Sequence, residues 1–171
     1  MSQTDLFISK LKSVGATVKT INSHSELVQE VHRYSAENQI KSTITVTEDE
    51  AFNDLDLDKM DVDSALELQS MILSVTFAWM GIEETGTLVI LSSSYSPNSL
   101  NFLPDHHLIV LNQESIVKSM NDVWNQLRKE QKDMPKVINM VTGPSCSADI
   151  DTDIEAHGPK YLHVVLLNES L

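Results

Sequence analysis

A Gly-Pro-Ser turn in the segment VINMVTGPSCSADI is the pattern in this sequence with the clearest chemical potential. A strand-like run ends at Thr142, and Gly143 then allows a ligand to approach the backbone closely. Ser145 or Ser147 can cap a helix that begins near Ala148. Free amides at such a helix end, together with the helix dipole, bind anions. The competing interpretation is an ordinary strand-to-helix turn with a serine cap.

A second candidate is the segment GIEETGT, which places two adjacent carboxylates between apolar runs. Burial of a bare carboxylate is costly, so Glu83 and Glu84 must be paired or reach solvent. A carboxylate at a strand end beside a glycine turn can act as nucleophile, general base or hydrogen-bond acceptor for a ligand hydroxyl. A hairpin turn with both acids in water explains the segment equally well.

The segment AHGPK, just before the last apolar run, supplies a histidine that could act as acid or base. For His157 the simpler interpretation, an exposed side chain at a Gly-Pro turn, is favoured. Cys146 is the one cysteine of the chain, and a lone cysteine is more often inert, so it is given no catalytic role.

Several other sites are excluded by spacing. Asp54, Asp56 and Asp58 have the spacing that opens an EF-hand loop, but Lys59 and Ala65 stand where the loop requires Gly and Glu. No HExxH, G-x-G-x-x-G, Walker or G-x-S-x-G motif occurs. One cysteine cannot ligate an iron–sulfur cluster or a cysteine zinc site. The sequence therefore predicts no metal site and no cofactor in this chain.

The elements that must position these segments alternate between helix-like and strand-like periodicity, which predicts an α/β fold with a mostly parallel sheet. In such folds ligands bind beyond the carboxyl ends of strands, so the loops after Val141 and Met80 are expected to matter. The expected helices are Thr4–Val14, one that begins in a Ser23–Glu26 capping box, a short one after Ser64, and Ser115–Gln131. The expected strands are Ala16–Ile21, Ile40–Thr47, Ile72–Met80, Thr87–Leu91 as a central strand, Leu108–Leu111, Lys136–Val141 and Tyr161–Leu167.

Composition limits the class of protein. The chain has 171 residues and 19.1 kDa, which favours one domain over residues 1–171. A net charge of −13 makes nucleic acid and anionic membrane surfaces poor partners. No signal peptide is recognised in MSQTDLFISKLKSVG, and the longest apolar run, Met71–Ile82, is too short to span a bilayer. We expect an acidic, soluble, cytoplasmic protein, with the acid-rich stretch Glu48–Asp63 as an exposed loop.

Four segments in this order resemble the LUD domain, best known from lactate utilization protein C. They are IEETGT, LNFLPD, TGPSCSADI and His-Gly-Pro before LHVVLL, and the resemblance covers roughly residues 72–167. It implies a fold of the NagB/RpiA/CoA-transferase group, with helices on both sides of a mainly parallel sheet in three layers. The site residues that it implies are Glu84 as the catalytic candidate, His157 as a weaker one, and for ligand binding Thr85, Gly86, Thr87, Gly143, Pro144, Ser145, Asp149 and Gly158. The amides of Cys146 and Ser147, in the same turn, are added as ligand-binding candidates from the turn itself.

The sequence also departs from the family pattern. The family usually has an Arg where Cys146 stands, and a small residue where Glu83 stands. Loss of an Arg weakens charge-assisted, bidentate binding of a carboxylate or phosphate, and Glu83 adds negative charge. Either the ligand differs from the family's, or the family activity has been lost.

The resemblance implies a role in lactate and organic-acid utilization, in which lactate is oxidised to pyruvate with iron–sulfur partner proteins. Without redox motifs this chain would be a non-redox accessory subunit that binds a small anion between the EETGT and GPSCSAD turns. Asp149 would orient the second turn. The alternatives are a self-sufficient enzyme of the CoA-transferase or isomerase kind that uses Glu84, and a non-catalytic binding or regulatory module.

Overall fold

Two β-sheets organise the described part of the chain. The computed structural model describes residues 2–40, 44–46, 73–92, 101–102, 104–130, 135–145 and 158–168. Sheet A is entirely parallel and has the order β1 (Thr17–Ile21), β9 (Tyr161–Leu167), β6 (His106–Asn112), β3 (Leu73–Ala78), β2 (Ile44–Val46). Sheet B is mixed and has the order β7 (Ile116–Val117), β4 (Met80–Ile82), β5 (Thr87–Leu91), β8 (Ile138–Val141).

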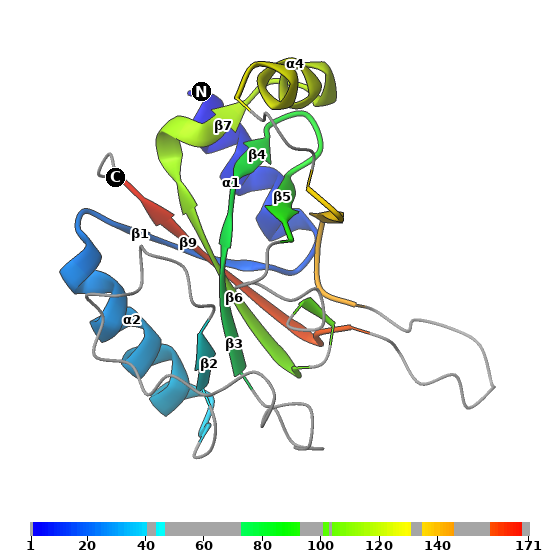
Figure 1. Ribbon diagram of the computed structural model, residues 1–171. Helices are drawn as coiled ribbons and strands as arrows, with labels where there is room; N and C mark the ends of the chain where they lie inside the picture. The colour runs from blue at the N-terminus through cyan, green and yellow to red at the C-terminus, as the bar shows by residue number, and fades with distance from the viewer. Residues whose placement is uncertain are drawn as a thin grey trace.

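Helices cover both faces of sheet A (Figure 1). Helix α2 (His24–Glu37) packs on one face, while α1 (Gln3–Ser13) and sheet B pack on the other. Helix α4 (Met120–Glu130) packs on sheet B, and a 3₁₀ turn, η3 (Gln113–Ser115), leads into β7. The predicted α/β fold with helices flanking a parallel sheet is confirmed, and sheet B adds a layer that the sequence pattern did not predict.

Side chains along the central strands of sheet A alternate between its two faces, and apolar side chains bury both faces from water. In β9 the side chains of Val165 and Leu167 contact the α2 layer, and those of Val164 and Leu166 contact the α1 layer. Successive strand residues point to opposite faces, so a run with few polar residues is required where both faces are covered. The sequence YLHVVLL satisfies this requirement except at His163, which is itself 3% exposed.

The apolar run before Gly81 is two strands rather than the single strand that was predicted. β3 ends at Ala78 in sheet A and β4 begins at Met80 in sheet B. Trp79 lies at the break, and its amide donates to the Val89 carbonyl of β5. Thr87–Leu91 has the predicted bounds and is paired on both sides as a central strand is, but it lies in the mixed sheet B and runs antiparallel to both neighbours.

One predicted helix start and one predicted capping bond differ from the structure. Ser115–Gln131 was predicted as one helix, but Ile116 instead pairs with Gly81 in sheet B, and α4 begins only at Met120. The Ser119 amide and hydroxyl donate to the Asp122 carboxylate there. Ser23 does precede α2, but its side chain makes no capping bond.

Some predictions fall on residues outside the described ranges. These are the acidic loop 48–63 and the short helix after residue 64. Of the expected strand Ile40–Thr47, the structure describes β2 over Ile44–Val46. Across the described ranges, no helix combines the length and apolar character needed to cross a bilayer.

We expect Gly81→Ala to destabilise the fold by about 1–3 kcal/mol, because an added methyl overpacks the layer between the sheets. A Cβ at Gly81 would lie 2.7 Å from Leu111 Cδ2 and 2.9 Å from Phe7 Cζ. Urea unfolding followed by circular dichroism measures the loss. Lys129→Ala, on the exposed side of α4, is the control, and equal stability of the two variants would contradict the packing argument.

Candidate functional site

The structure brings three of the predicted turns together at the end of α1. The turn after β8 places Gly143 and Pro144 against the α1–β1 connection: a Cβ at Gly143 would lie 3.0 Å from Val14 Cγ2, and one at Gly15 would lie 3.7 Å from Pro144 Cγ. The β4–β5 turn contacts the same helix through Gly86, whose ideal Cβ would lie 2.7 Å from Lys10 Cβ. Both turns therefore pack against the end of α1.

The segment before β9 joins the same cluster. The Ser145 amide donates to the Pro159 carbonyl at 2.7 Å. A Cβ at Gly158 would lie 3.0 Å from the Ser145 Cβ, and Gly158 has φ +142°, so this contact requires glycine on two grounds. The Ser145 amide is therefore already hydrogen-bonded within the protein. Among the described residues of this turn, Gly143 supplies the amide that stays a candidate for binding a ligand.

A chain of threonine hydroxyls links the two predicted ligand-binding turns. Thr85 Oγ1 lies 2.7 Å from Thr87 Oγ1, which lies 2.9 Å from Thr142 Oγ1. Thr87 is 5% exposed, whereas Thr85 and Thr142 are both exposed, so the chain has a buried middle and two ends that reach solvent. Each hydroxyl can donate one hydrogen bond and accept others, so a ligand at an exposed end of the chain, such as Thr85, can find a donor or an acceptor.

Glu84 lies at the other edge of the hairpin. Its amide donates to the Lys118 carbonyl, and the Glu83 amide donates to the Val117 carbonyl, which ties this half of the turn to the β7 side. The Glu84 side chain is exposed, and within the described ranges its carboxylate makes no hydrogen bond or ion pair with the turn at 142–145. A catalytic role for Glu84 stays a prediction.

Four of the predicted site residues lie outside the described residues. They are His157, Cys146, Ser147 and Asp149, and the expected helix near Ala148 lies there too. Thr85, Gly86, Thr87, Gly143, Pro144, Ser145 and Gly158 are the predicted ligand-binding residues that the structure describes and places in one cluster.

The expected position of the site relative to the strands needs a correction. The turn after Val141 does follow a carboxyl end, but β8 belongs to sheet B, and Met80 begins β4 rather than ending a strand. The cluster lies instead where β1 and β9 of the parallel sheet begin, next to Gly15 and Gly158. The carboxyl-end rule describes open parallel sheets, and an added mixed sheet need not follow it.

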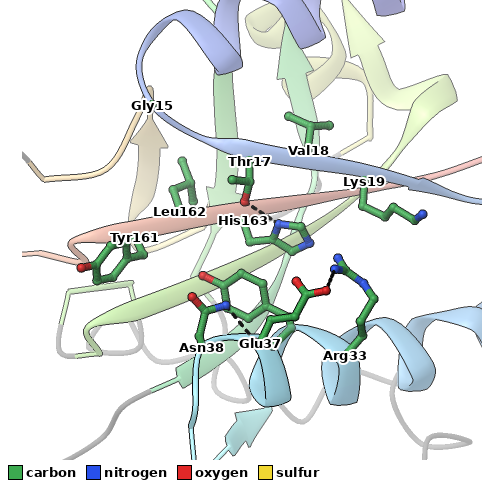
Figure 2. A pocket seen from close by; sticks show the side chains of 11 residues that line it. Gly15, Thr17, Val18, Lys19, Arg33, Glu37, Asn38, Tyr161, Leu162 and His163 are labelled. Carbon is green, nitrogen blue, oxygen red and sulfur yellow. Dashed lines mark hydrogen bonds and ion pairs between the residues drawn. The ribbon is translucent and has the colours of Figure 1, made fainter.

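A cavity of about 370 Å³ opens on the α2 side of the same strand ends (Figure 2). Its walls come from α2, from the start of β1 and from the start of β9. Gly15 contributes to both the cavity and the turn cluster, so the two features are neighbours. The side chains that define its chemistry are Thr17, Lys19, Arg33, Tyr34, Tyr161 and His163.

A hydrogen-bonded row runs from the cavity lining into the protein, and Glu30, its innermost member, lies behind the lining residues. His163 Nε2 lies 3.0 Å from Glu30 Oε1, and His163 Nδ1 lies 2.6 Å from Thr17 Oγ1. Glu30 and His163 are 4% and 3% exposed, whereas Thr17 is exposed. Arg33 donates to both Glu30 and Glu37 and holds the carboxylate from the solvent side.

The charge states in this row follow from burial and partners. Burial opposes ionisation of Glu30, but hydrogen bonds from Arg33 and His163 outweigh it, and the net pKa of this carboxyl lies below its ordinary value. Burial lowers the pKa of His163, although the bond to Glu30 opposes the shift. At neutral pH the row therefore holds an ionised carboxylate and a neutral imidazole.

Aromatic side chains continue this hydrogen-bonded row from His163 to the exposed ring of Tyr161. Tyr34 stacks on His163 with ring centroids 4.6 Å apart, and its hydroxyl lies 2.9 Å from His106 Nδ1. Tyr161 stacks on His106, with ring centroids 4.5 Å apart, and is 55% exposed. Burial raises the pKa of Tyr34 to about 12 and lowers the pKa of His106, so both are neutral at pH 7.

Sequence reasoning did not predict this cavity, although two signals were present. Glu30 falls on the apolar side of α2, together with Leu27, Val31 and Tyr34. His163 interrupts the apolar run of β9 on the face that meets α2. A charged residue on an apolar stripe and a polar residue inside an apolar strand are each a reason to expect a buried partner.

The adjacent histidines of β6, His106 and His107, point to opposite faces of the sheet, because successive strand residues alternate. His107 is 1% exposed on the α1 side, where its Nε2 lies 2.7 Å from Thr76 Oγ1. Burial lowers its pKa to about 3. In the described part of the chain, no group of three His, Cys, Asp or Glu side chains is placed to hold a metal ion.

Together these features define a two-sheet α/β protein with glycine-rich turns gathered at the amino ends of two parallel strands. Residues 4–167 match the LUD domain model, so the chain belongs to the LUD domain family.

Curated relatives and one solved structure agree with this assignment. Lactate utilization protein C of Bacillus velezensis is 31% identical over 102 residues, which cover 57% of this chain and 42% of that protein. The Bacillus licheniformis protein of the same name is 35% identical over 92 residues, 51% of this chain and 38% of that protein. The matches thus span less than half of these relatives. A DUF162 family protein from Deinococcus radiodurans has the same fold, with TM-score 0.71 and 18% identity, over 98% of this chain and 99% of that one.

Thr87→Val is expected to destabilise the protein by about 1 kcal/mol, because it removes the buried middle hydroxyl of the chain together with its hydrogen bonds to Thr85 and Thr142. Thr85→Val, at an exposed end of the same chain, is the matched control and is expected to cost less than about 0.5 kcal/mol. Denaturant unfolding measures both, and a larger loss in Thr85→Val would contradict the assignment.

Stability is expected to fall as the pH is lowered from 6.5 toward 4. Below pH 6.5 the unfolded chain binds a proton at His107, whereas the folded protein, with a pKa of about 3 at this site, does not. One such group contributes up to about 1.4 kcal/mol per pH unit to the slope. His107→Gln is expected to reduce the slope of the unfolding free energy against pH. An equal reduction in His32→Gln, where the imidazole is exposed on α2, would contradict this origin.

Proposed function

We propose that this chain is a non-redox subunit of lactate or related organic-acid utilization that holds a small anionic ligand where the EETGT and TGPS turns meet. The observation that carries the proposal is the direct link between those turns, Thr85 to Thr87 to Thr142, with Ser145 bonded to the segment before β9. The family and the names of the curated relatives supply the pathway.

Redox chemistry in this proposal is assigned to partner subunits. Lactate oxidation removes two electrons, and the single cysteine of the chain cannot ligate an iron–sulfur cluster. The chain's own contribution is to bind and orient a carboxylate. The Gly143 amide and the threonine hydroxyls are the proposed donors. Thr85, one exposed end of the hydroxyl chain, directly follows Glu84 in the sequence.

A cation from α1 is part of the proposed site. The family pattern has an Arg where this chain has Cys146. A bound anion must therefore be paired with a positive charge from another residue. Lys10 lies in the last turn of α1 and packs its Cβ against Gly86 of the EETGT turn. We assign to Lys10 the electrostatic role of the missing Arg.

A thermal-shift screen tests the ligand site. The panel holds lactate, pyruvate, glycolate, sugar phosphates, CoA and acyl-CoAs, and a ligand at 100 times its Kd adds about 2.7 kcal/mol, or about 5–10 °C in Tm. We expect a carboxylate to give this shift in the wild type, and Lys10→Gln to lose it. Lys12→Gln, on the same helix turn, is the matched control.

The same screen separates the alternatives. A shift confined to acyl-CoAs, with an acyl adduct on Glu84 that is absent in Glu84→Gln, would replace the proposal with a CoA-transferase-like enzyme. Gentle tandem purification of the full chain tests the partners, with iron content and visible absorption of the eluate as the readout. Absence of iron–sulfur proteins from the eluate would overturn the subunit role.

A further inference from the structure

Two side chains that line the cavity, Thr17 and His163, belong to a row of three groups that the proposed anion site does not use. A carboxylate, Glu30, bonds an imidazole, His163, which in turn bonds a hydroxyl, Thr17 (Figure 2 shows the last of these bonds). The three come from α2, β9 and β1, and Thr17 and His163 are direct partners in the parallel pairing. A nucleophile, its base and a group that orients the base are recognised by this geometry rather than by sequence position.

The hydrogen-bond directions in the row are determined. An ionised Glu30 can only accept, so His163 must carry its proton on Nε2 and donate it to Glu30 Oε1. The neutral ring then has a lone pair on Nδ1, and Thr17 must donate its hydroxyl proton to it across 2.6 Å. The Thr17 oxygen is thus polarised by a base, and its lone pairs stay available to the cavity.

Burial alone does not account for Thr17 in this position. Glu30 is already held by Arg33 and His163, so the buried charge is paired without the threonine. Thr17 is exposed at the edge of sheet A, where water can satisfy a hydroxyl. Its hydroxyl nonetheless faces the imidazole and lines the cavity together with Lys19, two residues further along the same strand face.

We propose that Thr17, His163 and Glu30 form a second reactive site, in which the Thr17 hydroxyl accepts an acyl group from a small ester or thioester bound in the cavity. Thr17 Oγ1 forms a bond to the carbonyl carbon while its proton passes to His163 Nδ1. The bond from that carbon to the leaving alkoxide or thiolate then breaks, and the leaving group takes the proton from His163. Water hydrolyses the acyl-threonine by the same two proton transfers.

Other residues of the cavity favour an anionic acyl group. Lys19 lines the cavity two residues from Thr17, and its positive charge favours a negatively charged group on the bound ester or thioester. Arg33 adds a second cation, although Glu30 and Glu37 already bond it. Glu30 is a positioning residue in this scheme, because it acts through His163.

The probe for the test is p-nitrophenyl acetate with the full chain. The wild type is expected to release p-nitrophenolate in a burst and to carry one acetyl group on Thr17, identified by fragment ions that separate Thr17 from Lys19. Thr17→Val keeps the β-branched shape and is expected to lose the adduct and slow the release at least about 100-fold. Thr17→Ser is expected to retain the adduct.

The matched control is Thr20→Val, an exposed residue of β1 on the opposite strand face, which is expected to behave as wild type. An acetyl group found only on lysines, or equal rates in wild type and Thr17→Val with unchanged circular dichroism, would overturn the proposal. The proposed anion site is tested without this probe, so the two can fail separately.

The positioning role of Glu30 is tested by a pH profile. The acylation rate is expected to rise with pH and to level off once His163 is neutral, and Glu30→Gln is expected to move this midpoint to lower pH, because an imidazolium loses its negative partner. A purely structural Glu30 would change the Tm and leave the midpoint in place. The charged and titratable groups around His163 that enter the profile are Glu30, Arg33, Tyr34, Glu37, Lys19 and His106.

Discussion

The parallel pairing of β1 with β9 is the interaction on which the rest of this structure depends. It joins residues 146 positions apart in the chain, with Thr17 opposite His163 and Ile21 opposite Leu167. Its register places the turn before β1 next to the segment before β9, so Gly15 and Gly158 both reach the loop around Ser145. A slip of one residue would turn His163 away from Glu30 and reverse the two faces of the strand.

Helix α1 connects this pairing to the second sheet. Phe7 and Leu11 fill the layer between the sheets, and close packing there leaves room for no side chain at Gly81. The end of the same helix contacts the β4–β5 turn and the turn after β8. The end of α1 and Gly15 therefore contact the candidate site, although neither carries a motif that points to chemistry. The role proposed for Lys10 follows only from where α1 ends.

The two candidate sites illustrate different uses of polar groups. The turn cluster presents hydroxyls at the surface and binds its segments together through backbone geometry. The cavity instead lies beside a buried ionised carboxylate and a buried neutral imidazole, and the bonds of Glu30 to Arg33 and His163 pair the buried charge. Buried polar rows of this kind constrain side-chain positions tightly, and that constraint is what a reacting group requires.

The sequence by itself determined the local features: the α/β alternation, the strands Thr87–Leu91 and Tyr161–Leu167, and the glycine turns at Gly86 and Gly143, because periodicity and turn chemistry act over a few residues. It also indicated the family through four short segments. Only the tertiary structure decided that the apolar run breaks at Trp79 between two sheets, that the turns meet at strand beginnings, and that Glu30 finds His163. These outcomes depend on which distant strands pair and in which register, and local pattern carries no information about such pairing.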